Sequence, residues 1–368
     1  MTLGQDRDAA GLAAGGVAVP GAERPSLATV ARTLAVAGIG GSAFALAGAP
    51  LAWMLGAMFV ATGAAMSGRM RLGIYPWLRT AMIAVLGVML GSAFTPALLA
   101  EIPGWWPAVS ALAVYVAGLT AASYAFFRYV GGYDPVTAYF SAPPGGLTEM
   151  ALMGQDLGAD MRTISLIHAT RILIVVATVP LYFRLVEGLE VPALPRDVGR
   201  LVDIPLAEAT ILAGCALLGV PLGTASRVPA GALIGPMALS AAVHLAGWSS
   251  AKPPAEIVAA AQVVVGASIG CRFAGLSLAE ARRTVALGSV SGALMVLLAT
   301  ATAYMLAGAL ARPADVLALS FAPGGLAEMA LIALILGIDT AFVSAMHVLR
   351  IAMVVIGVPL VFGLFRRN

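Results

Sequence analysis

The chain has 368 residues, of which 60% are hydrophobic and 11% are charged, and its formal net charge is +3. Soluble domains carry about 25% charged residues, so this composition excludes an ordinary soluble domain and predicts an all-α polytopic membrane protein. The basic residues are scattered in short segments without long runs. We therefore interpret them as topology determinants for a chain in a lipid bilayer, and expect no binding of nucleic acid.

Residues 1–26 are rich in Ala and Gly and lack a compact apolar region, so we expect a flexible cytoplasmic tail and no cleaved signal peptide. Ten apolar stretches of spanning length follow, given that about 17–25 residues cross a bilayer. They are 28–47, 50–66, 77–99, 105–127, 161–185, 206–224, 229–247, 255–274, 284–310 and 340–364. Residues 186–205 are polar and rich in Pro, which predicts a linker between membrane repeat 1 (27–185) and membrane repeat 2 (206–368).

The two halves repeat one another at an offset of 179 residues. Residues 141–152 read SAPPGGLTEMAL, and residues 320–331 read SFAPGGLAEMAL. Between 141–185 and 320–364 no gap is needed, and 23 of 45 positions are identical. The repeat includes the GxxxG pairs Gly87/Gly91 and Gly266/Gly270, whose expected role is helix packing.

The positions of the basic loops indicate how the halves are oriented. The basic loop follows the second span in the first half (69–79) and the third span in the second half (272–283). This shift by one crossing predicts inverted repeats with both termini in the cytoplasm. Five spans plus one re-entrant hairpin per half give the odd number of crossings that inversion needs. In the alternative, each hairpin is a broken helix that crosses, which gives twelve crossings and parallel halves.

A Pro-Gly-Gly break precedes the last span of each half. Pro and Gly end a helix, and backbone freed within hydrocarbon must be covered by protein or by a wet cavity. New half-helices are expected near Leu147 and Leu326, with partial positive charge at their N-termini. Paired ends of this kind hold substrate and coupling ion in many secondary transporters.

Ionisable residues follow both breaks at matching positions. Glu149 and Glu328 fall in the first turn of the half-helices, where a carboxylate satisfies free N–H groups or binds an ion, a proton or an arginine. A His and an Arg with i, i+3 spacing share one face of the last span. Each charge at the bilayer centre costs about 2.5–3.5 kcal/mol. We therefore expect Glu–Arg pairing, around a polar cavity or as a structural clamp.

The predicted substrate- or ion-binding residues are Pro144, Gly145, Gly146, Thr148, Glu149, His168 and Arg171 in the first copy, and Pro323, Gly324, Gly325, Glu328, His347 and Arg350 in the second. The first copy has polar residues where the second has apolar ones, namely Tyr139, Thr148, Gln155, Asp156 and Thr170. We therefore expect the hydrophilic part of a ligand to contact the first copy. The chain has three His and two Cys, and we expect no metal site and no cofactor.

The doubled PGG-L-x-EMAL segment, the downstream His-x-x-Arg and the duplicated apolar chain resemble the bacterial AbrB-like membrane family. Its members carry the labels AbrB family transcriptional regulator and ammonia monooxygenase. The resemblance implies a multi-pass inner-membrane protein that is linked to the expression of another gene. The scattered His and Cys do not fit a metal-dependent monooxygenase, and we expect no enzymatic activity. At fold level the chain is similar to inverted-repeat transporters of the cation/proton antiporter and bile-acid symporter type.

These observations predict a secondary transporter that moves a small anionic or zwitterionic metabolite by alternating access. Arg171 and Arg350 would supply charge complementarity. The alternative is a membrane-embedded regulator of gene expression without transport. The expected partners are a small-molecule or ion substrate and the lipid bilayer, and the sequence is compatible with a homo-oligomer.

Overall fold

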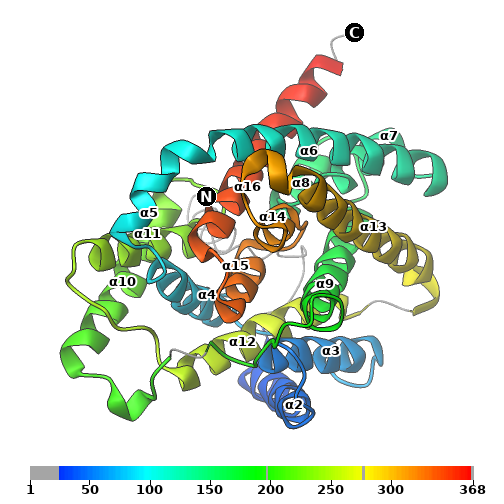
Figure 1. Ribbon diagram of the computed structural model, residues 1–368. Coiled ribbons are helices and arrows are strands. Elements are labelled where there is room, and N and C mark those ends of the chain that lie inside the picture. Colours follow the sequence, from blue (N-terminus) through cyan, green and yellow to red (C-terminus); the bar gives the residue numbers. More distant parts are fainter. Residues whose placement is uncertain (1–24, 196–197, 276–277, 366–368) are drawn as a thin grey trace, which may run out of the picture. The chain divides into compact units, whose positions relative to one another are not determined.

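The computed structural model of the protein describes residues 25–195, 198–275 and 278–365 (Figure 1). Every regular element in these ranges is a helix, so the expected all-α class is confirmed. Seven helices are long and apolar enough to cross a membrane, as is typical of a multi-pass membrane protein. They are Leu27–Leu46, Ile102–Val130, Met161–Leu185, Leu206–Ala225, Ala255–Phe273, Ala281–Leu310 and Thr340–Leu364. The predicted tail lies almost entirely outside the described ranges.

Three of the ten predicted spans are shorter than expected. The helices α3 (Ala52–Met66), α4 (Pro76–Gly91) and α11 (Gly231–Leu245) have 15, 16 and 15 residues. Fifteen residues rise about 22 Å, which is less than the roughly 30 Å of hydrocarbon. Both α3 and α11 begin after a left-handed residue, Leu51 (φ 42°) and Ala230 (φ 57°), and such a residue stops a right-handed helix from continuing.

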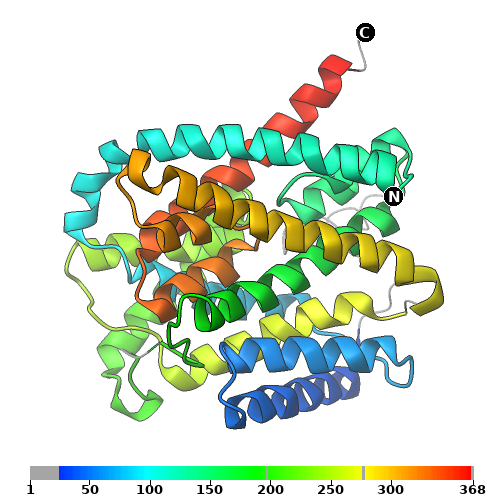
Figure 2. The ribbon, with the colours of Figure 1, turned by 45° about the vertical axis from the view of Figure 1, so that its right-hand side comes forward.

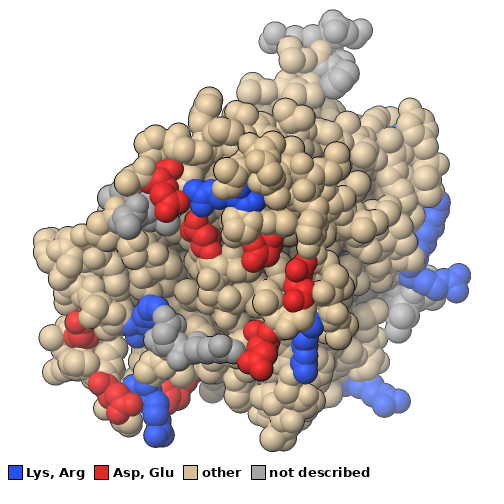
Figure 3. All heavy atoms as spheres, in the orientation of Figure 1, with Lys and Arg blue, Asp and Glu red and all other residues tan. Residues whose placement is uncertain are grey.

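The helices form two compact units, each with elements from both halves of the sequence. The first unit comprises Met1–Pro96, Phe183–Leu278 and Leu334–Leu336, and the second comprises Ala97–Tyr182, Ala279–Ala333 and Gly337–Asn368. The predicted repeats, 27–185 and 206–368, are segments of the sequence and are not the same as these two units. The division into repeats stays a prediction. Charged side chains are sparse on the face drawn in Figure 3, most of which is neither acidic nor basic.

The first unit contains three helices from each half, with bounds that recur after 179 residues. Adding 179 to the bounds of α2, α3 and α4 gives those of α10, α11 and α12. These helices are α2 (Leu27–Leu46), α3, α4, α10 (Leu206–Ala225), α11 and α12 (Ala255–Gly270). The short 3₁₀ turns η3 (Leu201–Asp203) and η4 (Cys271–Phe273) precede α10 and follow α12.

The second unit is built around two interrupted helices. Its elements are η1 (Ile102–Trp105), α6 (Trp106–Ala125), the π-helix η2 (Phe126–Val130), α7 (Pro135–Ser141), α8 (Leu147–Asp156), most of α9 (Met161–Leu185), α13 (Leu278–Leu310), α14 (Ala314–Phe321), most of α15 (Leu326–Leu336) and α16 (Thr340–Phe365). The short helix α5 (Pro96–Glu101) leads into η1.

Glycines bring the helices of the first unit into close contact. Within each half the first two helices pair, as Figure 2 shows for α2 and α3. A Cβ atom on Gly56 of α3 would overlap the carbonyl oxygen of Gly40 in α2, and one on Gly235 would overlap that of Gly219 in the same way. Small residues let helix backbones approach closely in lipid, so each of these pairs depends on them.

The third helix of each half packs on the second helix of the other half. A Cβ atom on Gly87 of α4 would lie 2.5 Å from the carbonyl oxygen of Leu233 in α11. In the matching place, a Cβ atom on Gly266 of α12 would overlap the carbonyl oxygen of Met54 in α3. The expected packing role of the GxxxG pairs is confirmed, and it joins the two halves within one unit.

We expect Gly266→Ala to lower the thermal unfolding temperature, because overpacking a close contact costs about 1–3 kcal/mol. Gly63→Ala on α3 is the matched control, since its added Cβ meets no atom within 4 Å. Alanine otherwise favours a helix over glycine, so the control should be as stable as the parent or more so. Circular dichroism on heating, in one detergent, measures both variants. Equal unfolding temperatures would contradict the packing.

Candidate functional site

Both Pro-Gly-Gly segments interrupt a helix where the sequence predicts. In the first break α7 ends at Ser141 and α8 begins at Leu147, and in the second α14 ends at Phe321 and α15 begins at Leu326. Glu149 and Glu328 stand in the first turn of α8 and α15, as expected. All the predicted site residues belong to the second unit.

The helix α7 has a well-defined start. One carboxylate oxygen of Asp134 accepts hydrogen bonds from the backbone N–H groups of Val136 and Thr137, at 3.0 and 2.9 Å. Partial burial raises the pKa of Asp134, but hydrogen bonds from Thr137 and from the backbone outweigh that effect, so the pKa lies below its ordinary value. This N-cap fixes the direction in which α7 leads to the first break.

The glycines serve different purposes in the two breaks. Gly145 (φ 141°) and Gly146 (φ 64°) adopt positive φ angles that other residues rarely reach. In the second break, a Cβ atom on Gly325 would overlap a carboxylate oxygen of Glu328, so glycine there leaves room for that carboxylate beside the backbone. Glu149 lies near Gly146 in the corresponding place, 3.8 Å from where a Cβ would be.

Arg350 closes the second break. Its guanidinium group is buried, and its two terminal nitrogens donate hydrogen bonds to the carbonyl oxygens of Ala322 and Gly324. These carbonyls lie just beyond the end of α14, where no further helical turn supplies donors. His347, one turn earlier, donates from Nδ1 to the carbonyl of Val343 at 3.1 Å, and its buried Nε2 has no hydrogen-bond partner among the described residues.

Arg171 occupies the same position in the first copy but has different contacts. One terminal nitrogen donates to Nδ1 of His168 at 2.8 Å, and the other is 3.9 Å from the sulfur of Met295. A guanidinium can only donate, so Nδ1 of His168 accepts and its Nε2–H donates to the carbonyl of Phe140 at 3.0 Å. In this copy the histidine therefore binds a carbonyl near the end of α7.

The two breaks adjoin the same helix, α16. Arg350 of α16 binds the second break, and a Cβ on Gly146 of the first break would lie 3.5 Å from both Val354 and Val355. Arg350 and Val354 are one turn apart, about 6 Å along the axis. The hydroxyl of Tyr139 in α7 also donates to the carbonyl of Val358 at 2.8 Å. Two segments far apart in the sequence thus meet along one helix.

Two residues that sequence reasoning missed connect Arg171 to the second break. Met295 of α13 contacts Arg171, and its carbonyl accepts a hydrogen bond from the hydroxyl of Tyr115 at 3.4 Å. The ring of Tyr115 stacks on Phe321 at the end of α14, with 5.3 Å between centroids. The sequence could have pointed to Tyr115, because its hydroxyl group stands in the middle of an apolar span. Nothing in the sequence distinguishes Met295 from the apolar residues around it.

The contacts that the described residues provide for the two guanidinium groups are with partners other than the expected glutamates, and the Glu–Arg pairing stays a prediction. Within the described residues, Arg350 binds carbonyl oxygens and Arg171 binds an imidazole and a thioether. Glu149 and Glu328 lie instead beside the glycines that start α8 and α15, where free N–H groups favour a carboxylate. Across the described ranges, no group of three His, Cys, Asp or Glu side chains is placed to hold a metal ion.

Several buried polar atoms of the second unit lack hydrogen-bond partners within the described part of the chain. They are Nε1 of Trp105, Oγ of Ser141, Oγ of Ser165, Oγ1 of Thr170, Nε of Arg171, Nε2 of His347 and Nε of Arg350. Buried polar atoms are nearly always satisfied by protein, water or ligand, so these positions indicate where a polar molecule is needed. Of the two buried arginines, Arg171 is the less satisfied, because one of its two contacts is to a thioether, which is a weak acceptor.

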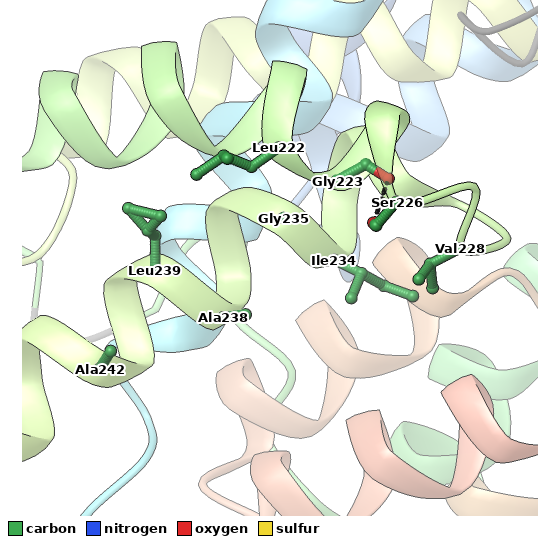
Figure 4. Close-up of a pocket in the computed structure, with 9 residues that line it drawn as sticks. All are labelled: Leu222, Gly223, Ser226, Val228, Ile234, Gly235, Ala238, Leu239 and Ala242. Carbon is green, nitrogen blue, oxygen red and sulfur yellow. Dashed lines mark hydrogen bonds between the residues drawn. The ribbon is translucent and has the colours of Figure 1, made fainter.

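A separate hollow of about 470 Å³ lies in the first unit, between α10 and α11 (Figure 4). It contains none of the predicted site residues. Its lining residues are Leu222, Gly223, Ser226, Val228, Ile234, Gly235, Ala238, Leu239 and Ala242. The lining is almost entirely apolar, so this hollow offers no charge to an ionic ligand.

We expect Arg350→Gln to destabilise the protein more than Arg171→Gln. Arg350 makes two hydrogen bonds to carbonyls, and each bond from a charged group contributes about 1.5–3 kcal/mol. Arg171 makes one such bond, to His168. The two unfolding temperatures, measured in the same detergent, provide the comparison, and an equal or larger loss in Arg171→Gln would contradict the assignment.

Comparison with known proteins places the chain in a family. The family described as "Transition state regulatory protein AbrB" matches residues 53–366. The protein YhjN of Bacillus subtilis (strain 168), whose name states no function, is 26% identical over 353 residues, covering 89% of this chain and 90% of the relative. A candidate regulator of Escherichia coli (strain K12), AbrB, is 26% identical over 285 residues, covering 75% of this chain and 79% of the relative. The resemblance inferred from the sequence is confirmed, and the chain belongs to the AbrB family.

Proposed function

We propose that the protein is a secondary transporter of a small anionic or zwitterionic metabolite. The observation that carries this proposal is the meeting of the two breaks along α16 beside Arg171, a buried guanidinium with unmet donors. A carboxylate or phosphate oxygen would accept from Nε of Arg171 and from the nitrogen that now faces Met295. The same ligand would compensate a buried positive charge that costs free energy in the bilayer.

The two arginines have different tasks in this proposal. Arg171 binds the anionic group of the ligand, whereas Arg350 holds the second break closed by hydrogen bonds to two carbonyls. This division revises the expectation that both arginines supply charge complementarity. It agrees with the polarity of the first copy, where the buried hydroxyl groups of Thr170 and Ser141 have no hydrogen-bond partner in the described part of the chain.

We infer that the halves are inverted and that each Pro-Gly-Gly segment is a re-entrant hairpin. Parallel halves would put Arg312 opposite Glu101 across the membrane, and Arg283 opposite Gly131. Arg312 instead forms an ion pair with Glu101 at 2.9 Å, and Arg283 donates to the carbonyl of Gly131 at 2.8 Å. In an inverted topology, the two residues of each pair lie on the same side of the membrane.

The hairpins are also short. The helix α8 has 10 residues and α15 has 11, so each rises about 15–17 Å, roughly half of the hydrocarbon thickness. This length favours half-helices that enter and return. Inverted halves give two related conformations, one open to each side, and this pair of conformations is the basis of alternating access. The basic loops favour the bacterial inner membrane, with both termini in the cytoplasm.

The second candidate is a membrane-embedded regulator of gene expression without transport. The printed names of the family and of the Escherichia coli relative favour it. A transported metabolite that alters gene expression would reconcile both descriptions. In either case we propose that the protein is not an enzyme.

The transport proposal predicts solute flux into proteoliposomes that contain the purified protein. A panel of radiolabelled small carboxylates, phosphate esters and amino acids identifies the substrate. Arg171→Gln should reduce the flux about 30-fold or more, because removing one partner of a buried charge pair costs about 2–5 kcal/mol. Arg162→Gln, an exposed arginine on the same helix, is the matched control and should keep the parental flux. Folded protein without flux for any solute, together with an effect on gene expression, would favour the regulator.

The asymmetry of the copies predicts unequal effects of the two glutamates. Glu149→Gln should impair flux more than Glu328→Gln, because Glu149 belongs to the copy whose neighbouring residues are polar. Initial rates at saturating and limiting substrate separate loss of binding from loss of turnover. Equal loss in the two variants would sink the assignment of the ligand to the first copy.

A further inference from the structure

Two arginines hold the loop that joins α6 to α7. The last turn of α6 widens into the π-helix η2, which carries Arg128. Arg128 donates from its guanidinium to the carbonyl of Tyr133 at 3.1 Å, and Arg283 of α13 donates to the carbonyl of Gly131 at 2.8 Å. The hydroxyl groups of Tyr133 and Thr284 are 3.0 Å apart, which ties the loop to α13 a second time.

These contacts bring two positive charges together at one end of the second unit. The carbonyls that they bind are two residues apart, so they are within about 7 Å of one another. Each guanidinium has five N–H donors, and one contact to the loop leaves most of them available. Asp134 is the carboxylate of this loop, and its Oδ1 already accepts two hydrogen bonds at the start of α7. The pair therefore has donors available for a further anion.

The pair lies at the ends of two membrane spans. The span Ile102–Val130 ends beside Arg128, and the span Ala281–Leu310 begins beside Arg283. Tyr129 and Val130 are 79% and 64% exposed, and a tyrosine at the end of a span is typical of the membrane–water interface. This place at the ends of two candidate spans fits the depth of lipid headgroups, and exposed apolar side chains follow along α13 at Val290 and Leu297.

We propose that Arg128 and Arg283 form a binding site for the phosphate group of an anionic phospholipid. Paired arginines bind phosphate oxygens through several charge-assisted hydrogen bonds, and basic pockets at the ends of membrane helices bind anionic headgroups. The acyl chains would lie along the exposed residues of α13. Because the loop leads directly into α7, the bound lipid would hold the first break in place. This site does not depend on the proposed transport.

The test measures the thermal unfolding of the full chain in a neutral detergent with added lipid. Phosphatidylglycerol should raise the unfolding temperature, and phosphatidylcholine and inorganic phosphate at equal concentration should not. Arg128→Gln and Arg283→Gln should each weaken the phosphatidylglycerol effect about five-fold in apparent affinity, since one basic side chain near an anionic surface contributes about 1 kcal/mol. Arg282→Gln, a neighbour on the same helix that is as exposed as Arg283, is the matched control and should keep the parental response.

Each other outcome overturns the proposal. Equal loss in Arg282→Gln would mean general attraction by surface charge. Equal protection by inorganic phosphate would mean a site for a soluble anion. If a glutamine variant does not fold, Arg128→Lys and Arg283→Lys replace it. These variants keep the charge but lose the forked donors, so they should bind phosphatidylglycerol more weakly than the parent, and an unchanged affinity would contradict a built site.

Discussion

The second unit depends on one constraint: a helix that is broken among apolar residues leaves carbonyl groups that still need donors. The donors come from the last span of each half, which runs past its own break. Arg350 satisfies the carbonyls of Ala322 and Gly324, and His168 satisfies that of Phe140. A broken helix and a buried polar pair are therefore parts of a single solution, and neither would be stable without the other.

The two copies meet this constraint differently. In the second copy the arginine itself binds the break, whereas in the first copy the histidine does so and Arg171 is turned toward Met295. A duplicated segment has thus provided one clamp and one buried cation that the protein does not fully satisfy. The difference favours a ligand at the first copy and gives the second copy a structural task.

Sequence reasoning predicted the features that depend on local chemistry. The starts of α8 and α15 follow from Pro and Gly, and the recurrence of the halves follows from direct comparison. The short α3 and α11 were not predictable, because nothing in a Leu or an Ala announces a left-handed backbone. The partners of Arg171 and Arg350 depend on which helices pass nearby, so their contacts with carbonyls, an imidazole and a sulfur could not be predicted from the sequence.

In the first unit the third helix of each half packs on the second helix of the other half, and this arrangement has a consequence for synthesis. The glycines of α4 pack on α11, and those of α12 pack on α3. The ribosome therefore synthesises α2, α3 and α4 before α11 and α12, the partners of α4 and α3, exist. Until the second half is inserted, lipid or a chaperone must cover those faces. The last of its six helices, α12, is complete only when about three quarters of the chain has been made, and an interruption before that point leaves the first half without its packing partners.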